Sequence, residues 1–146
     1  MAEDKHDRKK EEQNKKLQQK YLELQLLDQQ MKQVQKQVEA VERQVAEIEE
    51  VRKSLDELAA SRTGSEMFVP ISNGIFVKAR LEDNKSLAVN VGGSTVVKKD
   101  IPSTKAMLEE QAVDMRKFQA EMIEQFEKMA ERAAELQREL QELTGE

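Results

Sequence analysis

The side chains that could carry out chemistry in this chain are mostly carboxylates and amines, because histidine occurs once and cysteine is absent. His6 stands beside Asp7 in a charged N-terminal stretch, without the second ligand that a metal site needs. Acidic pairs such as Glu109-Glu110 belong to charge runs that face water on a helix. No histidine or glycine-rich loop accompanies them. We therefore expect no enzyme, no catalytic residue, no metal and no cofactor.

Gly92-Gly93 could be taken for a loop that holds a phosphate group. Such a loop precedes a helix N-terminus and usually carries a Gly-Lys-Ser/Thr sequence. Here the two glycines lie between two candidate strands and neither feature follows them. The pair therefore predicts a hairpin turn.

Charge and hydropathy narrow the class of protein further. Residues 101–146 carry six basic and eleven acidic side chains, and the basic run from Arg8 to Lys16 is interrupted by Glu11 and Glu12. A nucleic-acid interface normally needs an uninterrupted basic stripe, so none is expected. No apolar stretch approaches the roughly 18 residues of a membrane helix, and the N-terminus has no signal-like apolar region. Without cysteine to suggest an oxidising compartment, a soluble, cytoplasmic protein with no membrane contact is predicted.

Glycine and proline divide the chain into three parts. They are concentrated between Gly64 and Pro102, and both destabilise helix interiors, by about 1 and about 3 kcal/mol. We expect an N-terminal helix in residues 1–62, a turn-rich segment in residues 63–102 and a C-terminal helix in residues 103–146. The charged residues 1–16 precede the apolar repeat, and the sequence leaves their order open. Gly64 is expected to cap the first helix, and Ser103 or Thr104 to begin the second.

A seven-residue repeat of apolar side chains runs through both helical segments. Apolar residues at alternating spacings of three and four form one stripe, which a slightly underwound helix buries against a second helix. In the first segment the stripe consists of Leu17, Leu24, Met31, Val38 and Val45 and of Leu27, Val34, Val41, Ile48 and Leu55. In the second segment it consists of Leu108, Met115, Met122, Met129, Leu136 and Leu143 and of Ala112, Phe126, Ala133 and Leu140, with Phe118 replacing the residue expected at Gln119. The two stripes are similar in length, which favours antiparallel pairing within the chain.

One charged residue interrupts this repeat. Arg52 occupies a stripe position in the first segment where an apolar residue is expected. Its aliphatic stem is predicted to cover the groove while the guanidinium reaches solvent.

Between residues 66 and 101 the apolar period falls to about two, which indicates β-strands. Four short strands fit, with turns at Ser72-Asn73-Gly74, Glu82 to Lys85 and Gly92-Gly93-Ser94. Two such hairpins are marginally stable alone, so we expect them to pair with other chains. The residues predicted to make this assembly surface are Phe68, Val69, Ile75, Val77, Leu81, Leu87, Val89, Val91, Val96 and Val97.

The order helix, double hairpin, helix resembles the alpha-type subunit of prefoldin, particularly its archaeal form. The specific residues lie in the middle segment: Val69-Pro70-Ile71, Gly74-Ile75-Phe76-Val77 and Ala79, then Val89, Val91-Gly92 and Val96-Val97. The beta-type subunit of that family has one hairpin, so four candidate strands favour the alpha type.

The resemblance implies an α+β fold in which a long antiparallel coiled coil carries a central two-hairpin segment that oligomerises into a β-barrel platform. It also implies a hetero-hexamer of two alpha-type and four beta-type prefoldin subunits. By the same resemblance, the complex is an ATP-independent holdase that captures unfolded client proteins at the coiled-coil tips and delivers them to a group II chaperonin.

Antiparallel pairing brings the residues near 20 to those near 140, which defines the expected tip. There Leu22 and Leu26 lie off the stripe and are surplus to helix pairing, so they either contact clients or widen the local helix contact. The residues predicted to bind clients are Leu17, Tyr21, Leu22, Leu24, Leu26, Leu136, Leu140 and Leu143.

One alternative remains open from the sequence. Heptad repeats also occur in coiled-coil adaptors and tethers, which dimerise with one defined partner and have no general chaperone activity. Such a protein would form a stable dimer, whereas the chaperone interpretation requires a mixed hexamer.

Overall fold

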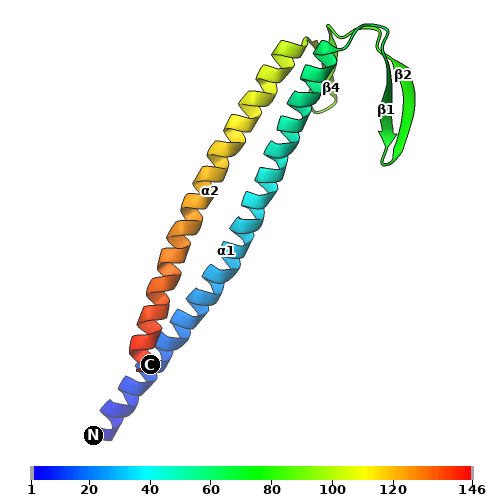
Figure 1. Cartoon of the computed structure of the whole chain (residues 1–146). Coiled ribbons are helices and arrows are strands. Elements are labelled where there is room, and N and C mark those ends of the chain that lie inside the picture. The colour runs from blue at the N-terminus through cyan, green and yellow to red at the C-terminus, as the bar shows by residue number, and fades with distance from the viewer. Residues whose placement is uncertain (1, 146) are drawn as a thin grey trace. The chain divides into compact units, whose positions relative to one another are not determined.

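The computed structural model describes residues 2–145 as two long helices joined through four short strands (Figure 1). The elements follow the order α1 (Ala2–Ala60), β1 (Glu66–Ser72), β2 (Ile75–Arg80), β3 (Leu87–Gly92), β4 (Thr95–Lys99) and α2 (Ile101–Thr144). The expected α+β class is confirmed. Contacts divide the chain into two compact units, one made by the residues up to Glu42 and from Lys117 onward, the other by Arg43–Arg116. In each unit the α1 and α2 segments run antiparallel, side by side.

The helix α1 begins at Ala2 and therefore includes most of the charged N-terminal stretch. No glycine or proline interrupts it, and Glu3 and Asp4 lie in its first turn, where negative charge complements the helix dipole. Every side chain from Ala2 to Lys16 is exposed. Residues 2–16, whose order the sequence left open, are thus helical, and Met1 lies outside the described residues.

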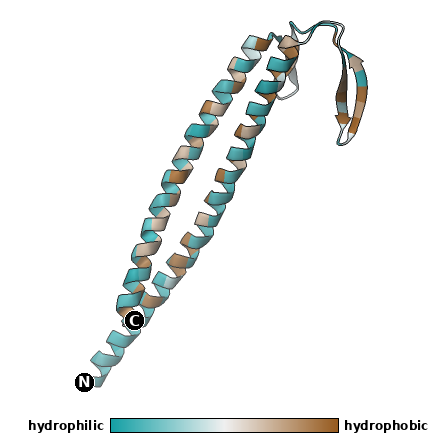
Figure 2. Cartoon of the chain, viewed as in Figure 1, coloured by the Kyte–Doolittle hydropathy of each residue, from teal (hydrophilic) through white to brown (hydrophobic). Residues whose placement is uncertain are grey.

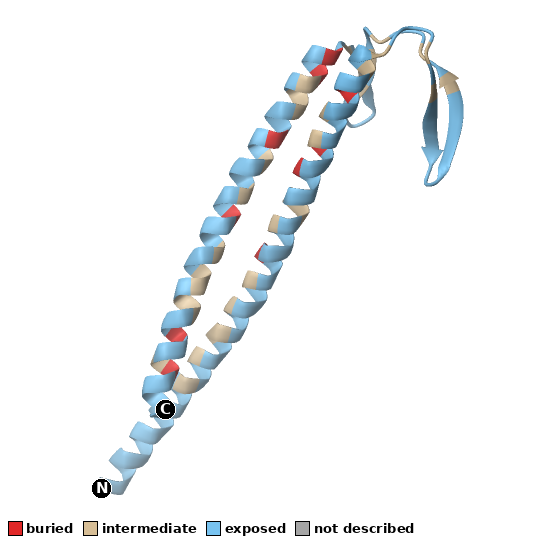
Figure 3. Cartoon of the chain, in the orientation of Figure 1, coloured by how far each residue is buried: buried red, intermediate tan, exposed pale blue. Residues whose placement is uncertain are grey.

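Apart from Ile101, the buried apolar side chains belong to the predicted stripe (Figure 3). In the unit that contains the start of α1 and the end of α2, the buried apolar residues are Val34, Met122, Leu136 and Leu140. In the unit Arg43–Arg116 they are Val45, Ile48, Leu55, Ile101 and Ala112. Positions between them, such as Met115 and Met129, are half-buried. In each unit the core is a narrow seam, as a composition with 38% hydrophobic residues requires.

One predicted seam residue is wrong. Phe118 is 57% exposed, and the half-buried Gln119 takes the seam position. Neighbouring residues on a helix project about 100° apart, so the seven-residue register decides which of the two faces α1. The polar side chain is accommodated because Gln119 Nε2 donates a hydrogen bond to the carbonyl oxygen of Val38 at 3.1 Å.

Arg52 also lies in the seam. Its guanidinium donates to Glu49 at 3.3 Å and to Glu109 on α2 at 3.4 Å, while its Nε is buried without a partner in the described part of the chain. The side chain is only 26% exposed. Arg52 thus lies in the seam as predicted, but its guanidinium does not project freely into solvent: it joins the two helices.

The residues at the start of α2 and the end of α1 do not cap the helices as expected. The N-cap of α2 is Asp100, whose Oδ1 accepts a hydrogen bond from the backbone N–H of Ser103 at 2.8 Å, so neither Ser103 nor Thr104 has this role. Hydrogen bonds from Ser103 lower the pKa of Asp100. Pro102 is accepted within the first turn, where its missing N–H has no helical partner. Gly64, with φ 88°, lies in the turn after α1 rather than in its cap.

The four strands form two separate antiparallel hairpins, β1 with β2 and β3 with β4. Opposite residues include Val69 and Val77 in the first hairpin and Val89 and Val97 in the second. Gly74 and Gly93 adopt positive φ angles of 79° and 59° in the tight turns, which confirms Gly92-Gly93 as part of a hairpin turn.

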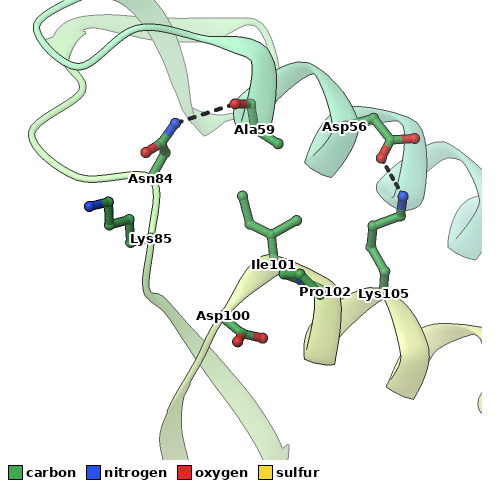
Figure 4. Close-up of a pocket in the computed structure, with 8 residues that line it drawn as sticks. All are labelled: Asp56, Ala59, Asn84, Lys85, Asp100, Ile101, Pro102 and Lys105. Atoms are coloured by element: carbon green, nitrogen blue, oxygen red, sulfur yellow. Dashed lines mark hydrogen bonds and ion pairs between the residues drawn. The ribbon is translucent and has the colours of Figure 1, made fainter.

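A cluster of hydrogen bonds holds the roots of the hairpins to the helices (Figure 4). The side-chain amide of Asn84, between β2 and β3, donates to the carbonyl of Ser61 at 3.0 Å and approaches those of Leu58 and Ala59. Lys105 forms an ion pair with Asp56 across the two helices, and Ile101 is buried beside them. Asn84, Ile101, Lys105 and Asp56 are among the residues that border an open cavity of about 650 Å³. The side chain of Asn84 thus supplies a hydrogen-bond donor to the carbonyls at the end of α1, a role that a glycine cap would otherwise fill.

Truncation of the most buried seam residue should measure how much the pairing depends on this seam. Leu136 is 0% exposed, so Leu136→Ala is expected to lower the free energy of unfolding by about 2–5 kcal/mol, through lost burial and the cavity left behind. Urea denaturation followed by helical circular dichroism measures the change. Leu22→Ala, at a residue 60% exposed, is the matched control and should cost less than about 1 kcal/mol. Equal losses for the two variants would contradict the assignment of the core.

Candidate functional site

Exposed apolar side chains are concentrated on α1 between residues 21 and 26. Tyr21, Leu22 and Leu26 are exposed to 50%, 60% and 51%. Leu22 and Leu26 are spaced i and i+4 and share one face of the helix, whereas Tyr21 projects about 100° away from Leu22. In Figure 2 the brown, hydrophobic colour of this region stands between more hydrophilic stretches of α1. Such surface normally serves contact with another molecule.

The other predicted client-binding residues are less exposed than these three. Leu17 and Leu24 are half-buried, and Leu136 and Leu140 are buried in the helix pair. Leu143, near the end of α2, is 38% exposed. Of the predicted client-binding residues, Tyr21, Leu22, Leu26 and Leu143 are therefore available to a partner, while Leu136 and Leu140 are buried between the two helices; Phe118 and Ile123 on α2 are also exposed in this unit. Leu22 and Leu26 do not widen the contact between the helices, because each is more than half exposed.

A shallow groove accompanies this apolar surface. It has a volume of about 420 Å³, and its lining combines apolar and polar side chains of both helices: Leu24, Gln25, Asp28, Met31, Ala133 and Gln137. The half-buried seam residues Leu24 and Met31 are accessible from it. Apolar contact area in this unit thus extends beyond the fully exposed leucines.

An ion cluster joins the helices in the same region. Lys20 on α1 pairs with Glu139 on α2, and Arg132 pairs with Glu23 at 3.0 Å and with Glu135 at 3.2 Å. Arg132 also lies 3.9 Å from Glu139, which connects the pairs. Because these groups flank a narrow apolar seam, they fix the register of the two helices near the exposed leucines.

The cluster changes the proton affinity of its members. The hydrogen bond from Lys20 lowers the pKa of the Glu139 carboxyl, and the positive charges of Lys20 and Arg132 act in the same direction. The hydrogen bonds that Arg132 donates to Glu23 and Glu135 raise the pKa of its guanidinium. Both groups are solvent-accessible, so water and salt weaken these interactions.

The first hairpin exposes apolar side chains on both faces. Cross-strand pairs place Val69 and Val77 on one face with Met67 and Ala79, while Phe68 lies on the other face. Phe68 and Ile75 are exposed to 70% and 58%. Glu66 forms ion pairs with Lys78 at 3.0 Å and Arg80 at 3.3 Å on the face of Phe68. Neither face is covered within the described residues, so both are available to other chains.

Leu81 was predicted on the apolar face of the second strand, but β2 ends at Arg80. Leu81 continues the pairing through its backbone, donating to Ser65 at 3.0 Å and accepting from Gly64 at 2.7 Å. The residue closes the base of the hairpin and is half-buried there.

Both faces of the second hairpin combine apolar and polar side chains. Leu87 and Val89 share one face, opposite Lys99 and Val97, and the register becomes irregular between Asn90 and Gly92, where Val91 lies. Val96 is directly opposite Asn90 and therefore belongs to the other face. Val91 and Val96 are exposed, whereas Leu87, Val89 and Val97 are half-buried.

The predicted surfaces do not include three further exposed apolar residues, Ile71, Phe76 and Ile123. Ile71 and Phe76 lie at the tip of the first hairpin, next to residues that were predicted. Their signal was the unusually continuous apolar run Phe68 to Ile71 and Ile75 to Val77, which exceeds what one buried face needs.

The described residues contain no group of three or more potential metal ligands. No helix in residues 2–145 is long and apolar enough to cross a membrane.

The fold and its surfaces define a class: a coiled-coil protein with β-hairpins whose edges and apolar faces are open. Residues 27–146 match the family model described as prefoldin subunit. A prefoldin subunit alpha from Methanococcus aeolicus is 27% identical over 93 residues, which cover 64% of this chain and 65% of that protein. Among solved structures, a chain of filamentous PFD from Methanocaldococcus jannaschii matches with a TM-score of 0.75 at 13% identity, covering 82% of this chain and 98% of that chain.

The chain belongs to the prefoldin family. Prefoldin is a chaperone family whose subunits assemble into oligomeric complexes, and it is not an enzyme family. The similarity to the Methanococcus aeolicus protein supports the alpha type. The structural match, at 13% identity, shows the fold alone.

Acid should weaken the helix pair near the candidate site. The pKa of Glu139 is lower in the folded chain than its ordinary value of 4.5, so its stabilising effect is present above that value and is lost as the pH falls through the folded pKa. We expect Glu139→Gln to reduce the difference in melting temperature between pH 7 and pH 3. Thermal unfolding at both pH values measures it. Glu131→Gln, at an exposed carboxylate of α2 with no ion pair in residues 2–145, should leave the difference unchanged.

Proposed function

We propose that this chain is the alpha-type subunit of an ATP-independent holdase. Its helix pair captures non-native polypeptides through Tyr21, Leu22, Leu26 and Leu143, and its hairpins join it to beta-type subunits. The observation that carries the proposal is the exposure of Leu22 and Leu26, which share a helix face and contribute little to the seam. Membership of a chaperone family gives this exposed apolar surface its most direct explanation.

Binding of unfolded chains requires contacts without directional demands. Burial of apolar surface provides about 25 cal/mol per Å² and depends little on the partner's exact shape. The flexible methionine Met31 and the leucine Leu24 border the adjacent groove and can add to such contacts. The surrounding charged residues keep the helices hydrated between binding events. A client would thus be held by many weak apolar contacts, without nucleotide hydrolysis.

We propose that residues 63–102, which contain both hairpins, act as one segment that assembles with other subunits. Both hairpins leave strand edges and apolar faces open, an arrangement that is marginally stable in isolation. We infer that they combine with those of other subunits in a β-barrel platform, in a hexamer of two alpha-type and four beta-type chains. Delivery of clients to a group II chaperonin in the cytoplasm completes the proposed function.

The oligomeric state separates this proposal from a coiled-coil adaptor. Co-expression with a beta-type prefoldin subunit should give one mixed complex whose native mass corresponds to two copies of this chain and four of its partner. Native mass spectrometry measures the stoichiometry. A stable homodimer that ignores the beta-type subunit would contradict the proposal and favour an adaptor.

The client surface can be tested by replacing its leucines. Leu22→Ser/Leu26→Ser in the co-purified complex should raise the concentration needed for half-maximal suppression of aggregation about three- to tenfold, since two apolar contact groups are lost. The measurement is light scattering by a chemically unfolded model protein diluted into buffer without nucleotide.

The matched control is Phe118→Ser/Ile123→Ser, which removes two exposed apolar side chains from α2 in the same compact unit. This variant should protect the model protein as well as the natural chain does. Unchanged protection by the Leu22→Ser/Leu26→Ser complex, with its hexamer intact, would sink the assignment of the client surface.

A further inference from the structure

The start of α1 continues past the end of α2 (Figure 1). Lys20 pairs with Glu139, and α2 ends soon afterwards at Thr144, whereas α1 begins at Ala2. Every side chain from Ala2 to Lys16 is exposed. The family model begins at residue 27, so it does not describe this part of the helix. The role of residues 2–16 therefore depends on their own side chains.

The helix separates charges that alternate in the sequence of residues 2–16. Successive residues of an α-helix are rotated by about 100°, so the position of each side chain around the axis follows from its number. One arc of about 120°, which we name the basic face, contains five cations and one anion: Lys5, Arg8, Lys9, Lys15 and Lys16, with Glu12. The rest of the surface of residues 2–16 carries four carboxylates and one lysine: Glu3, Asp4, Asp7 and Glu11, with Lys10. Glu11 interrupts the basic run in the sequence but lies outside the basic face.

The cations of the basic face are available to another molecule. Among residues 2–145, no ion pair involves any of the five. Lys20, which follows them on α1, is by contrast paired with Glu139. Like charges gathered on one surface attract a partner of opposite charge. The basic face therefore fits an acidic partner.

The basic face leads directly to the exposed leucines of the candidate site. Arg8, Lys15 and Leu22 follow one another at seven-residue intervals, about two helical turns each, so they lie along one line of the helix. Leu26 shares this line because it follows Leu22 at i+4. At about 1.5 Å per residue, Lys15 lies about 10 Å and Arg8 about 21 Å from Leu22 along the axis. No glycine or proline interrupts α1, so these spacings are fixed by one continuous helix.

We propose that the basic face and the leucines together bind polypeptide segments that carry acidic residues beside apolar ones. The apolar residues of the segment cover Leu22 and Leu26, and its carboxylates pair with Lys15 and Arg8. An extended chain advances about 3.3 Å per residue, so carboxylates about three and six residues from the apolar group reach these two cations. The inference rests on the proposed capture of clients and specifies the class of client: unfolded chains with acidic residues next to an apolar segment.

A polypeptide fits this surface better than a nucleic acid does. Glu12 lies among the cations, and it opposes the continuous contacts with phosphates on which nucleic-acid binding depends. A phosphate backbone also leaves Leu22 and Leu26 without an apolar partner. An acidic and apolar polypeptide segment satisfies both parts of the surface.

Two fluorescein-labelled peptides test the preference for acidic segments. They share one leucine- and phenylalanine-containing segment and differ only three and six residues from it, where one has aspartate and the other asparagine. Fluorescence anisotropy measures their binding to this chain co-purified with a beta-type prefoldin subunit. At low salt the aspartate peptide should bind about three- to tenfold more tightly, through two exposed ion pairs. The difference should shrink in about 0.5 M sodium chloride, which screens these charges.

Arg8→Gln/Lys15→Gln should bring the ratio of the two affinities close to one. Both residues are exposed, and glutamine is a good helix former, so α1 is retained. The matched control is Lys117→Gln/Lys128→Gln, which removes the same charge at two exposed positions of α2 in the same compact unit. This control should keep the preference for the aspartate peptide. An equal loss of preference in the control would overturn the basic face, because net charge alone would then explain the result.

The leucine variant separates this inference from the proposed function. Equal affinities for the two peptides, both weakened by Leu22→Ser/Leu26→Ser, would overturn the preference for acidic segments and leave the proposed capture of clients intact. Failure of both peptides to bind would overturn the proposed capture and this inference with it. Binding of the aspartate peptide that does not depend on Leu22 and Leu26, and that a single-stranded oligonucleotide matches through Arg8 and Lys15, would overturn the joint surface in favour of a nucleic-acid site.

Discussion

One stripe of apolar side chains, which holds two otherwise charged helices together, is the constraint on which this structure depends. The seam includes few fully buried residues, among them Leu136 and Met122. With 36% of its residues charged, the chain has no other apolar surface in its helices large enough to make a thick core. The stability of the pair is therefore distributed thinly along its length, and polar contacts at its margins determine the register. The ion cluster around Arg132 and the hydrogen bond of Gln119 have this role.

The hairpins differ from the helices in how their apolar residues are exposed. Their strands are rich in apolar residues, yet Phe68 and Ile75 are largely exposed. A two-stranded hairpin buries too little surface to offset its loss of conformational entropy, so its favourable environment must come from other chains. In the proposed complex, assembly would thus complete the folding of this segment as well as join the subunits. The helix pair, by contrast, is buried within one chain, which leaves its remaining apolar groups available for other contacts.

The elements could be predicted from the sequence because their signals are long and periodic. Ten heptad positions in the first helix and the placement of Gly64, Gly74, Gly92 and Gly93 locate both helices and all four strands. Single positions were less predictable. Phe118 is more apolar than Gln119, but the register of α2 outweighs residue type, and Gln119 finds a carbonyl acceptor that only the paired structure provides. The cap at Asp100 was missed because the expected boundary places Pro102 before the helix, although proline is tolerated in a first helical turn. Likewise, Leu136 and Leu140 belong to a region that the sequence places at the tip, but burial separates them from Leu22 and Leu26.

The position of Tyr21 has a practical consequence. The chain contains no tryptophan, and Tyr21 is its single tyrosine, next to the exposed leucines and half exposed itself. Its tyrosine absorbance band and tyrosine fluorescence therefore originate at one place on α1. The protein carries a built-in optical reporter there, whose signal is not mixed with that of the seam or the hairpins. With a client that lacks aromatic residues, changes around the candidate binding surface can be followed in the unlabelled chain.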